Sequence, residues 1–312
     1  MDTYLDEMSI EYIEQTAGIK ILPGLLGEGG SSFVLPANYL DWEDSITGFL
    51  INKFSPIPDF AVKIQKSPFG LDDISLRDFV SREIEFLKKL THNPDVLQPI
   101  SSGRTQYTNV DYIVFPHRAT LTEKYITWRK KPIGNLLQDM KTYAIQLHGL
   151  HVNDGVTHQD ISPGNLMIPS QISDFGCAKE IGVVVKVPRI NEAYSPPEQF
   201  KSGYVATPAQ DVWNFAISFY QTALKLTWDE TCELNENLRF ICNGQSNLGM
   251  EFPELSTYLN EISHLVYDNW AGTMESHWLK SALYNVGLYA FKPVEERHIR
   301  MDEIADILQA VI

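Results

Sequence analysis

The segment from His158 to Ile168, HQDISPGNLMI, sets an aspartate and an asparagine five residues apart in front of an apolar triplet. The carboxylate of Asp160 can accept a proton, and the amide oxygen of Asn165 is the kind of hard ligand that Mg²⁺ prefers. Held together by one turn, such groups could align a hydroxyl and a metal for phosphoryl transfer. Gln159 and Ser162, however, are neutral where a phosphate-handling enzyme would be expected to place cations.

A glycine-rich stretch, GEGGSSFV, runs from Gly27 to Val34. Because glycine lacks a Cβ and tolerates unusual dihedral angles, this backbone could approach phosphate groups closely. Taken alone, the stretch is a weak signal for nucleotide binding.

A single lysine, Lys63, is embedded in the apolar strand AVKI, where an unpaired ammonium group would be costly to desolvate. Glu83 is a candidate partner, because its helical neighbours three and four positions away are all apolar. Glu85, in contrast, has polar and basic neighbours and belongs to a solvated face. We therefore predict a Lys63–Glu83 ion pair, for which a purely structural role is the favoured reading from these residues alone.

Composition predicts a soluble protein of one large domain or two lobes, since 312 residues at 44% hydrophobic can bury a substantial core. The first residues are acidic and lack the order of a signal peptide, and no apolar run is long enough to span a bilayer. Three cysteines, Cys177, Cys232 and Cys242, show neither a paired framework nor metal-ligand spacing. This usage suits a reducing compartment, so we expect a cytoplasmic protein.

The formal net charge is −15, which opposes binding to nucleic acid or to an anionic membrane. It mildly favours a basic protein partner, although a contribution to solubility alone is the blander explanation. The sequence does not indicate an oligomeric state.

The order of predicted elements indicates an α+β protein with a small sheet lobe followed by a larger helical lobe. Short apolar runs broken by glycine and proline predict strands before about residue 65, and residues 75–90 have helical periodicity. From about Leu136 the pattern becomes mostly helical. Residues 211–226 are apolar nearly all round, which predicts a helix buried on every side.

Further motifs follow the catalytic-type segment in a fixed order: SDFG from Ser173, YSPPE from Tyr194, DVW from Asp211, and Arg297 near the end. Together with the glycine-rich stretch, the strand lysine and the helix glutamate, this set resembles the protein kinase family over roughly residues 21–312. The resemblance implies a two-lobed fold with an antiparallel-sheet N-lobe that carries one helix and a larger helical C-lobe. It also implies three parts, namely an N-terminal extension (1–20), an N-lobe with hinge (21–117) and a C-lobe (118–312).

The resemblance also assigns roles to the five residues with catalytic chemistry. Asp160 resembles the catalytic base, and Asn165 and Asp174 resemble the ligands of Mg²⁺ bridging the phosphates of ATP. Lys63 would hold the α- and β-phosphates, and Glu83 would orient Lys63.

Adenine and phosphate contacts follow from the same resemblance, with Phe115 as gatekeeper and residues 112–118 as the last strand and hinge. Pro116 lacks an N–H, but its carbonyl suffices, and Arg118 can donate its own amide. The residues expected to contact the nucleotide are Gly27, Gly29, Ser32, Val34, Ala61, Lys63, Phe115, Pro116, Arg118 and Met167.

Several departures from the family pattern bear on regulation and rate. Gln159 replaces an arginine that reads a phosphate in many relatives, and residues 177–193 contain no serine, threonine or tyrosine. We therefore expect no control by phosphorylation of this segment. Ser162 and Asn191 stand where a lysine and a threonine are usual; the Asn191 amide could donate to Asp160 and accept from Ser162, giving a neutral bridge.

The favoured hypothesis is an ATP- and Mg²⁺-dependent protein kinase acting on serine or threonine. One alternative is a pseudokinase scaffold, which retention of the five residues argues against. Another is a small-molecule kinase resembling aminoglycoside phosphotransferases, against which the YSPPE motif and Arg297 weigh. The resemblance further predicts a buried ion pair between Glu198 and Arg297.

Overall fold

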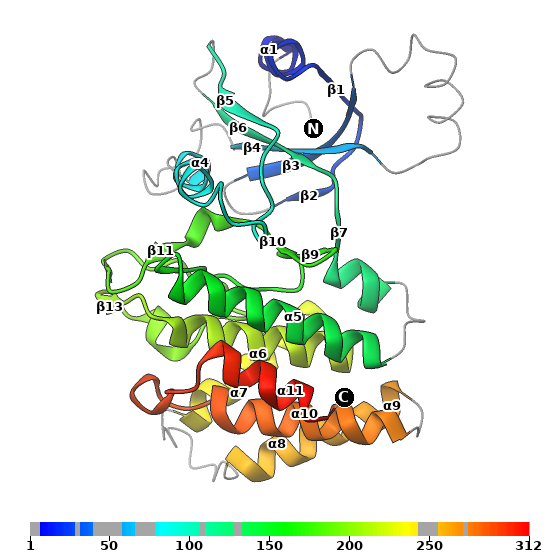
Figure 1. Ribbon diagram of the computed structural model, residues 1–312, viewed down its shortest axis with the longest axis vertical. Coiled ribbons are helices and arrows are strands. Elements are labelled where there is room, and N and C mark those ends of the chain that lie inside the picture. The colour runs from blue at the N-terminus through cyan, green and yellow to red at the C-terminus, as the bar shows by residue number, and fades with distance from the viewer. Residues whose placement is uncertain are drawn as a thin grey trace. The chain divides into compact units, whose positions relative to one another are not determined.

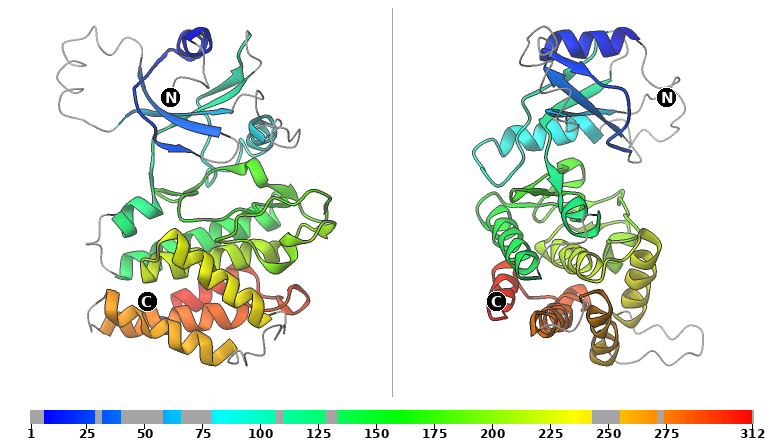
Figure 2. Two further views of the ribbon diagram at one scale, coloured as in Figure 1. Left: turned by 180° about the vertical axis from the view of Figure 1, so that it is seen from behind. Right: turned by 90° about the vertical axis from the view of Figure 1, so that its right-hand side faces the viewer.

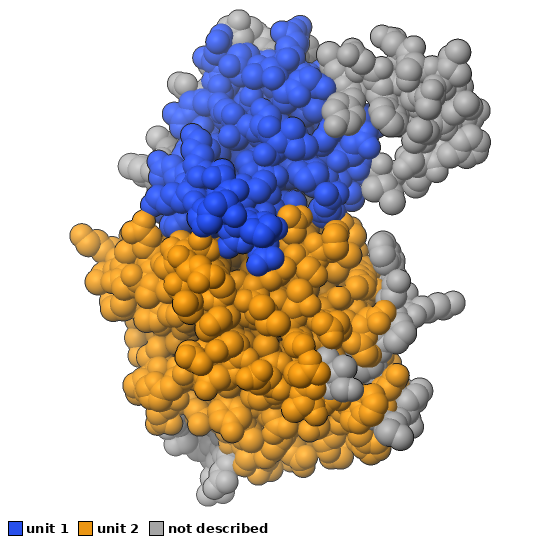
Figure 3. All heavy atoms as spheres, in the orientation of Figure 1, with its two compact units in different colours: residues 1–118 blue, residues 119–312 orange. Residues whose placement is uncertain are grey.

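The computed structural model describes residues 7–28, 32–39, 58–65, 79–106, 110–127, 133–242, 255–270 and 274–311. The chain divides into two compact units, Met1–Arg118 and Ala119–Ile312, coloured blue and orange in Figure 3. Each unit has its own core and is described by itself.

The first unit is built on a six-stranded antiparallel sheet in which the order is β1-β3-β4-β6-β5, with β2 paired to β3 (Figure 1). The strands are β1 (Ile19–Ile21), β2 (Gly27–Glu28), β3 (Ser32–Tyr39), β4 (Phe60–Gln65), β5 (Ser101–Arg104) and β6 (Asp111–Pro116). Helix α1 (Glu7–Ala17) packs against β1, and helix α4 (Phe79–Lys89) packs against β4 and β6.

One face of this sheet forms the core of the first unit. Because side chains alternate along a strand, Leu35, Val62 and Val114 point to the same side, and all three are buried. Ile13 of α1, which is fully buried, belongs to the same apolar cluster. Residues 7–17 therefore pack as part of this unit's core, although the sequence did not predict their helix.

The second unit is mainly helical. Its helices are η2 (Thr122–Thr127), α5 (Ile133–Val152), η3 (Phe175–Cys177), η4 (Pro197–Phe200), α6 (Pro208–Leu224), α7 (Trp228–Cys242), α8 (Leu255–His264), α9 (Val266–Asn269), α10 (Met274–Ala290), η5 (Val294–Glu296) and α11 (Met301–Gln309). Its strands are β7 (Ala119–Thr120), β8 (Val156–Thr157), β9 (Leu166–Ile168), β10 (Gln171–Ile172), β11 (Lys179–Glu180), β12 (Val184–Val185) and β13 (Tyr204–Val205). They form the ladders β7-β9-β10, β8-β11 and β12-β13, all antiparallel.

Helix α6 is the centre of the second unit, as its apolar sequence predicted. Every residue from Gln210 to Leu224 is buried, and the helix packs against α5, α7 and α10 (Figure 2). Its polar side chains are used internally: Trp213 Nε1 donates to Asn235 Oδ1, and Ser218 Oγ donates to the carbonyl of Ile161. This rigid helix supports the loop that carries Asp160.

The α+β class and the division into a sheet-rich and a helical part agree with the sequence prediction. The helix expected at 75–90 is α4, whose first expected turn, 75–78, lies outside the described residues. Gly29, one of the residues expected to contact the nucleotide, also lies outside them.

Candidate active site

Lys63 and Glu83 form the ion pair that the sequence predicted. Lys63 Nζ lies 2.7 Å from Glu83 Oε2, and the side chains are 7% and 0% exposed. Lys63 comes from the middle of β4 and Glu83 from the buried face of α4, whereas Glu85 is exposed. Since removing either charge would leave the other buried, the pair fixes α4 against the sheet.

The sheet face that carries Lys63 also carries most of the predicted adenine contacts. Val34 lies directly opposite Lys63 across the β3–β4 ladder, and Ala61 lies opposite Phe115 across the β4–β6 ladder. Ala61 and Lys63 are two residues apart, so all four side chains point to one face, opposite the α1 core. Pro116 lies opposite Phe60, and its side chain belongs to the other face.

Three further predicted nucleotide contacts lie in the first unit. Gly27 pairs with Val34 in the β2–β3 ladder, and Ser32, at the start of β3, is buried. Arg118 is exposed and directs Nη1 to the carbonyl of His117. Met167 belongs to the second unit, in β9, where Tyr143 donates to its carbonyl.

In the second unit, Asp211 of α6 holds the start of the catalytic-type loop. Its carboxylate accepts from the backbone amides of His158 and Gln159 at 2.8 and 2.7 Å, from Thr157 Oγ1 at 2.8 Å and from His151 Nε2 at 2.8 Å. Burial alone would raise the pKa of Asp211, but the hydrogen bond and charge of His151, the charge of His158 and its amide together lower it. The loop is thus anchored to a carboxylate that stays ionised.

The three oxygen-bearing residues of the loop are locked by short-range bonds. Asn165 Nδ2 donates to the carbonyl of Asp160 at 2.8 Å, and the Ser173 amide donates to the carbonyl of Asn165. Asp174 has a left-handed backbone (φ 62°), and its carboxylate accepts from the amide of Gly176 at 3.4 Å. The amide nitrogen of Asn165 is engaged with the loop, so Asn165 Oδ1 is the oxygen it can offer to a ligand.

His158 is part of the scaffold that supports the loop. It is fully buried, and its Nε2 lies 2.8 Å from the carbonyl oxygen of Ser173. The centres of the His158 and Phe175 rings lie 4.9 Å apart, in an edge-to-face arrangement. These contacts place His158 beneath the D-F-G motif, so Asp160 is the group in the loop that remains for proton transfer.

Asn191 reaches Asp160, as predicted, but does not form the second half of the expected bridge. Its Nδ2 donates to Asp160 Oδ1 at 2.9 Å. Its Oδ1 is buried and accepts no hydrogen bond from any described residue, so the predicted bond from Ser162 is wrong. The Ser162 side chain instead lies close to Gly164. The position of Asn191 is fixed by its backbone N–H, which donates to Ser195 Oγ.

Lys179, a cation that follows the D-F-G motif, is turned toward the backbone. Its Nζ donates to the carbonyls of Cys177 and Ala178 at 3.0 and 3.1 Å.

Burial raises the pKa of the Cys177 thiol, and the charges of Asp160 and Asp174 raise it further. Cys177 is therefore a packed thiol and not a reactive thiolate.

Gln159 is the centre of a neutral network that the sequence did not reveal. Its Nε2 donates to Thr157 Oγ1 at 2.8 Å and to Gln210 Oε1 at 3.3 Å. Its Oε1 accepts from Gln199 Nε2 at 3.0 Å and from Tyr204 OH at 2.9 Å. These partners come from β8, η4, β13 and α6, and no spacing rule links them in the sequence.

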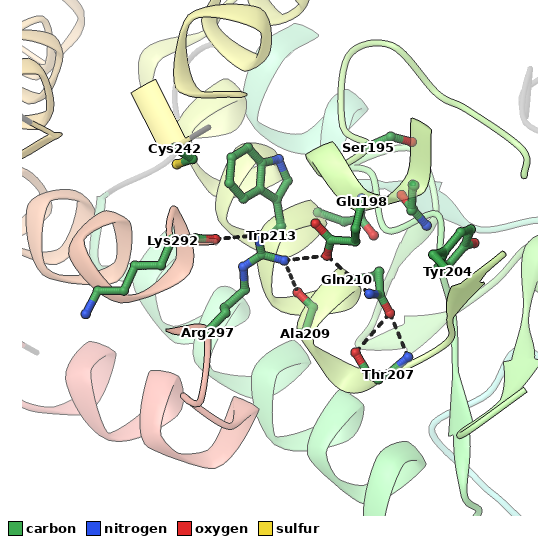
Figure 4. A network of polar contacts seen from close by, with 12 residues as sticks. Ser195, Glu198, Tyr204, Thr207, Ala209, Gln210, Trp213, Cys242, Lys292 and Arg297 are labelled. Carbon is green, nitrogen blue, oxygen red and sulfur yellow. Dashed lines mark hydrogen bonds and ion pairs between the residues drawn. The ribbon is translucent and has the colours of Figure 1, made fainter. Parts of the chain in front are cut away.

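The network continues to the predicted Glu198–Arg297 ion pair (Figure 4). Arg297 Nη1 lies 2.7 Å from Glu198 Oε1, which also accepts from Gln210 Nε2 at 3.1 Å. Arg297 further donates to the carbonyls of Ala209 and Lys292, and its guanidinium lies 4.8 Å from the centre of the Trp213 ring. The ion pair thus joins the YSPPE motif, the start of α6 and the end of α10.

The donor set suits Mg²⁺ held jointly with phosphate oxygens. Asn165 supplies an amide oxygen and Asp174 a carboxylate, both hard ligands. No cluster of three or more histidine, cysteine, aspartate or glutamate side chains able to hold a metal occurs in the part of the chain that the structure describes. A magnesium ion that takes one carboxylate and completes its shell with phosphates and water needs no such cluster.

Comparison with known proteins agrees with this arrangement. A family model for the protein kinase domain matches residues 59–270. The chain is 25% identical over 179 residues to the human serine/threonine-protein kinase Nek10, an alignment that covers 52% of this chain and 15% of that protein. It is 27% identical over 165 residues to bovine mitogen-activated protein kinase 13, covering 49% of this chain and 43% of that protein. It is 36% identical over 88 residues to the serine/threonine-protein kinase drp72 of Corynebacterium efficiens, covering 24% of this chain and 16% of that protein.

The aligned segments therefore span less than half of each of these relatives. Among the described helices, none has the length and apolar character needed to cross a membrane.

Proposed function

The chain belongs to the protein kinase family, and from this premise we propose that it transfers the γ-phosphate of ATP, with Mg²⁺, to a serine or threonine hydroxyl of a protein. The observation that carries this proposal is the hydrogen bond from Asn165 Nδ2 to the carbonyl of Asp160. It fixes a carboxylate and an amide oxygen within one turn, next to the turn that holds Asp174. Phosphoryl transfer depends on such positioning more than on covalent chemistry.

Asp160 is the proposed base, which accepts the proton of the attacking hydroxyl. Asn165 and Asp174 would hold Mg²⁺, which would neutralise charge on the phosphate oxygens. Lys63 would contact the α- and β-phosphates, and Glu83, 2.7 Å away, would keep its ammonium group in place. Val34, Ala61 and Phe115, on the same sheet face as Lys63, would line the adenine together with Met167. The hinge contacts of Pro116 and Arg118 and the phosphate contacts of Gly27, Gly29 and Ser32 are part of the same proposal.

We also propose that the activation segment, defined as residues 174–198, needs no phosphate to become ordered. The side-chain nitrogen and oxygen of Gln159 both form hydrogen bonds with neutral side chains. This position therefore offers no positive charge to a phosphate group. The segment is further held by backbone bonds from Gly182 to Ala206 and from Ala206 to Val183, at 2.8 and 2.9 Å. These bonds lie next to the β12–β13 ladder. Together with the ladder they would supply the order that an arginine–phosphate pair would otherwise supply.

The partner is proposed to be a protein, and the location cytoplasmic. The three-part division, with boundaries after residues 20 and 117, is also a proposal. Helix α1 falls in the proposed N-terminal extension, yet its Ile13 belongs to the core of the sheet.

The deciding experiment uses radiolabelled ATP with generic protein substrates and a panel of small-molecule acceptors. Wild type should label a protein, Asp160→Asn should lose at least 10²-fold in kcat, and Asp174→Ala should lose transfer entirely. Asp306→Asn changes an exposed aspartate of α11 and should behave as wild type. Nucleotide binding without transfer by wild type would support a pseudokinase, and labelling of small acceptors alone would support a small-molecule kinase.

A further inference from the structure

The short turn that carries Asn191 is closed by hydrogen bonds to the backbone of Asn191. The N–H of Asn191 donates to Ser195 Oγ at 2.9 Å. The N–H groups of Tyr194 and Ser195 donate to the carbonyl of Asn191 at 3.0 and 2.8 Å. This turn, which we define as the 191–195 turn, presents the Asn191 side chain to Asp160. The direction of that side chain therefore follows the orientation of the turn as a whole.

The carbonyls of this turn accept hydrogen bonds from two buried asparagines of neighbouring helices. Asn235 of α7 donates through Nδ2 to the carbonyls of Glu192 and Ser195, at 2.8 and 3.1 Å. Asn214 of α6 donates through Nδ2 to the carbonyl of Tyr194 at 2.7 Å. Because backbone carbonyls outside helices and strands need donors from elsewhere, these bonds attach the turn to the helical core.

The side-chain amide of Asn235 is held in one orientation by Trp213. Both residues are fully buried, and Trp213 Nε1 donates to Asn235 Oδ1 at 2.8 Å. An indole N–H can only donate, so the oxygen of the amide must face Trp213 and both protons of Nδ2 are left for the turn. An aspartate here would lack the two donors, and a leucine would lack the acceptor as well. The contacts of this position therefore require an amide.

Asn191 depends on such external support, because its side chain has few contacts of its own. Its Nδ2 donates to Asp160 Oδ1 at 2.9 Å, whereas its Oδ1 is buried and accepts no hydrogen bond from any described residue. A side chain held by one bond moves with its backbone, so a tilt of the 191–195 turn would carry the donor away from Asp160. A misplacement of about 1 Å can cost about 10²-fold in rate.

We propose that Asn235 is a positioning residue for phosphoryl transfer, which fixes the 191–195 turn and thereby holds the Asn191 amide against Asp160. This inference rests on the proposed kinase function. It gives α7 a part in the reaction, although the sequence analysis drew no candidate residue from this helix.

The first test is steady-state kinetics with radiolabelled ATP and the generic protein substrate that wild type labels. Asn235→Ala should lower kcat roughly threefold to tenfold and leave the KM for ATP unchanged. Asn237→Ala is the matched control, because it removes an amide of the same helix that donates to the Tyr258 hydroxyl at 3.3 Å. This control should keep the wild-type kcat. If Asn235→Ala raised the KM for ATP as much as it lowered kcat, the role of Asn235 would be structural only and the inference would be wrong.

A double-mutant cycle shows whether Asn235 acts through Asn191. Asn191→Ala removes the donor to Asp160, after which the orientation of the turn should no longer affect the rate. The double variant Asn191→Ala, Asn235→Ala should therefore lose the same roughly tenfold in kcat as Asn191→Ala alone. Losses that multiply would show that Asn235 affects the rate by another route and would overturn the inference.

The geometry is measured independently of transfer by nuclear magnetic resonance. The side-chain amide resonances of Asn191, identified by their absence in Asn191→Ala, should shift in Asn235→Ala and stay in place in Asn237→Ala. Ser195→Ala removes the acceptor of the Asn191 N–H and keeps the carbonyl bonds of Asn235. It should shift the same resonances and lower kcat, so it replaces Asn235→Ala in both measurements if that variant does not fold.

The two measurements separate this inference from the proposed function. Shifts of the Asn191 resonances in a protein whose wild type transfers no phosphate would support the hold of Asn235 on Asn191 and contradict only the kinase activity. Resonances that stay in place in both Asn235→Ala and Ser195→Ala would overturn the inference and leave the proposed function standing.

Discussion

Asn191 Nδ2 donates a hydrogen bond of 2.9 Å to Asp160 Oδ1 across 31 residues of sequence. The contact restrains one oxygen of the proposed base with a neutral donor. The side-chain oxygen of Asn191, Oδ1, is buried and accepts no bond from the described residues, so the orientation of Asn191 depends on its backbone bond to Ser195.

Asn191 should therefore act as a positioning residue for Asp160. We expect Asn191→Ala to lower kcat by roughly tenfold and Asn191→Asp to lower it by about 10²-fold or more, because the aspartate removes the donor and adds a like charge. Asn191→Thr, which keeps a donor, should recover most of the activity. The KM for ATP should stay constant throughout, and equal damage by all three substitutions would indicate a structural role only.

The ion pair between Glu198 and Arg297 should contribute strongly to stability. Arg297→Ala leaves Glu198 without its cation and removes the stacking on Trp213, so the free energy of unfolding should fall by about 3–5 kcal/mol. Arg300→Ala is the control: Arg300 is 65% exposed in its pair with Asp302, and its loss should cost less than about 1 kcal/mol. Chemical denaturation measures both values, and similar small losses would show that the pair contributes little.

Stability should depend on the ionisation of Asp211. Its pKa is lower in the folded protein than the ordinary aspartate value of about 3.9, so its contribution is fully present above that value and is lost as pH falls through the folded-state pKa. Asp211→Asn should cost roughly 1.5–3 kcal/mol at pH 7, and the difference from wild type should narrow below about pH 4. Asp306→Asn is the control. Unfolding curves between pH 7 and pH 3 test this, and a constant difference would contradict the assignment.

Activity should survive complete removal of phosphate. Gln159 holds Gln199 and Tyr204 through neutral bonds, and Tyr204 pairs with Val185 of the activation segment. Phosphatase-treated protein should therefore retain its full kcat. The substitution Tyr204→Phe removes one donor to Gln159 and should lower kcat about threefold to tenfold, because the segment loses about 1 kcal/mol of stability. Mass spectrometry confirms the absence of phosphate. A loss of activity that tracked removal of a phosphate from residues 174–198 would refute the proposal.

The sequence alone determined those features whose cause is local. The Asp160–Asn165 spacing lies within one turn, the burial of Glu83 follows from the period of α4, and the burial of α6 follows from its apolar composition. Each of these depends on residues a few positions apart, for which helix and strand geometry fix the relative placement. The Lys63–Glu83 pair was also predicted, because a charge in an apolar setting requires a partner. The Glu198–Arg297 pair was predicted from the resemblance to protein kinases.

Only the tertiary structure decided the contacts of neutral polar groups. Gln159, Gln199 and Tyr204 give no signal in the sequence, because a glutamine or a tyrosine is compatible with solvent and with many partners alike. The same is true of Ser162, whose predicted bond to Asn191 is absent. The structure also decided the pairing of the exposed Val184 with the exposed Val205, in strands about twenty residues apart in the sequence. Hydrogen-bond direction and strand register depend on the fold of the whole unit, so a linear pattern of residues cannot specify them.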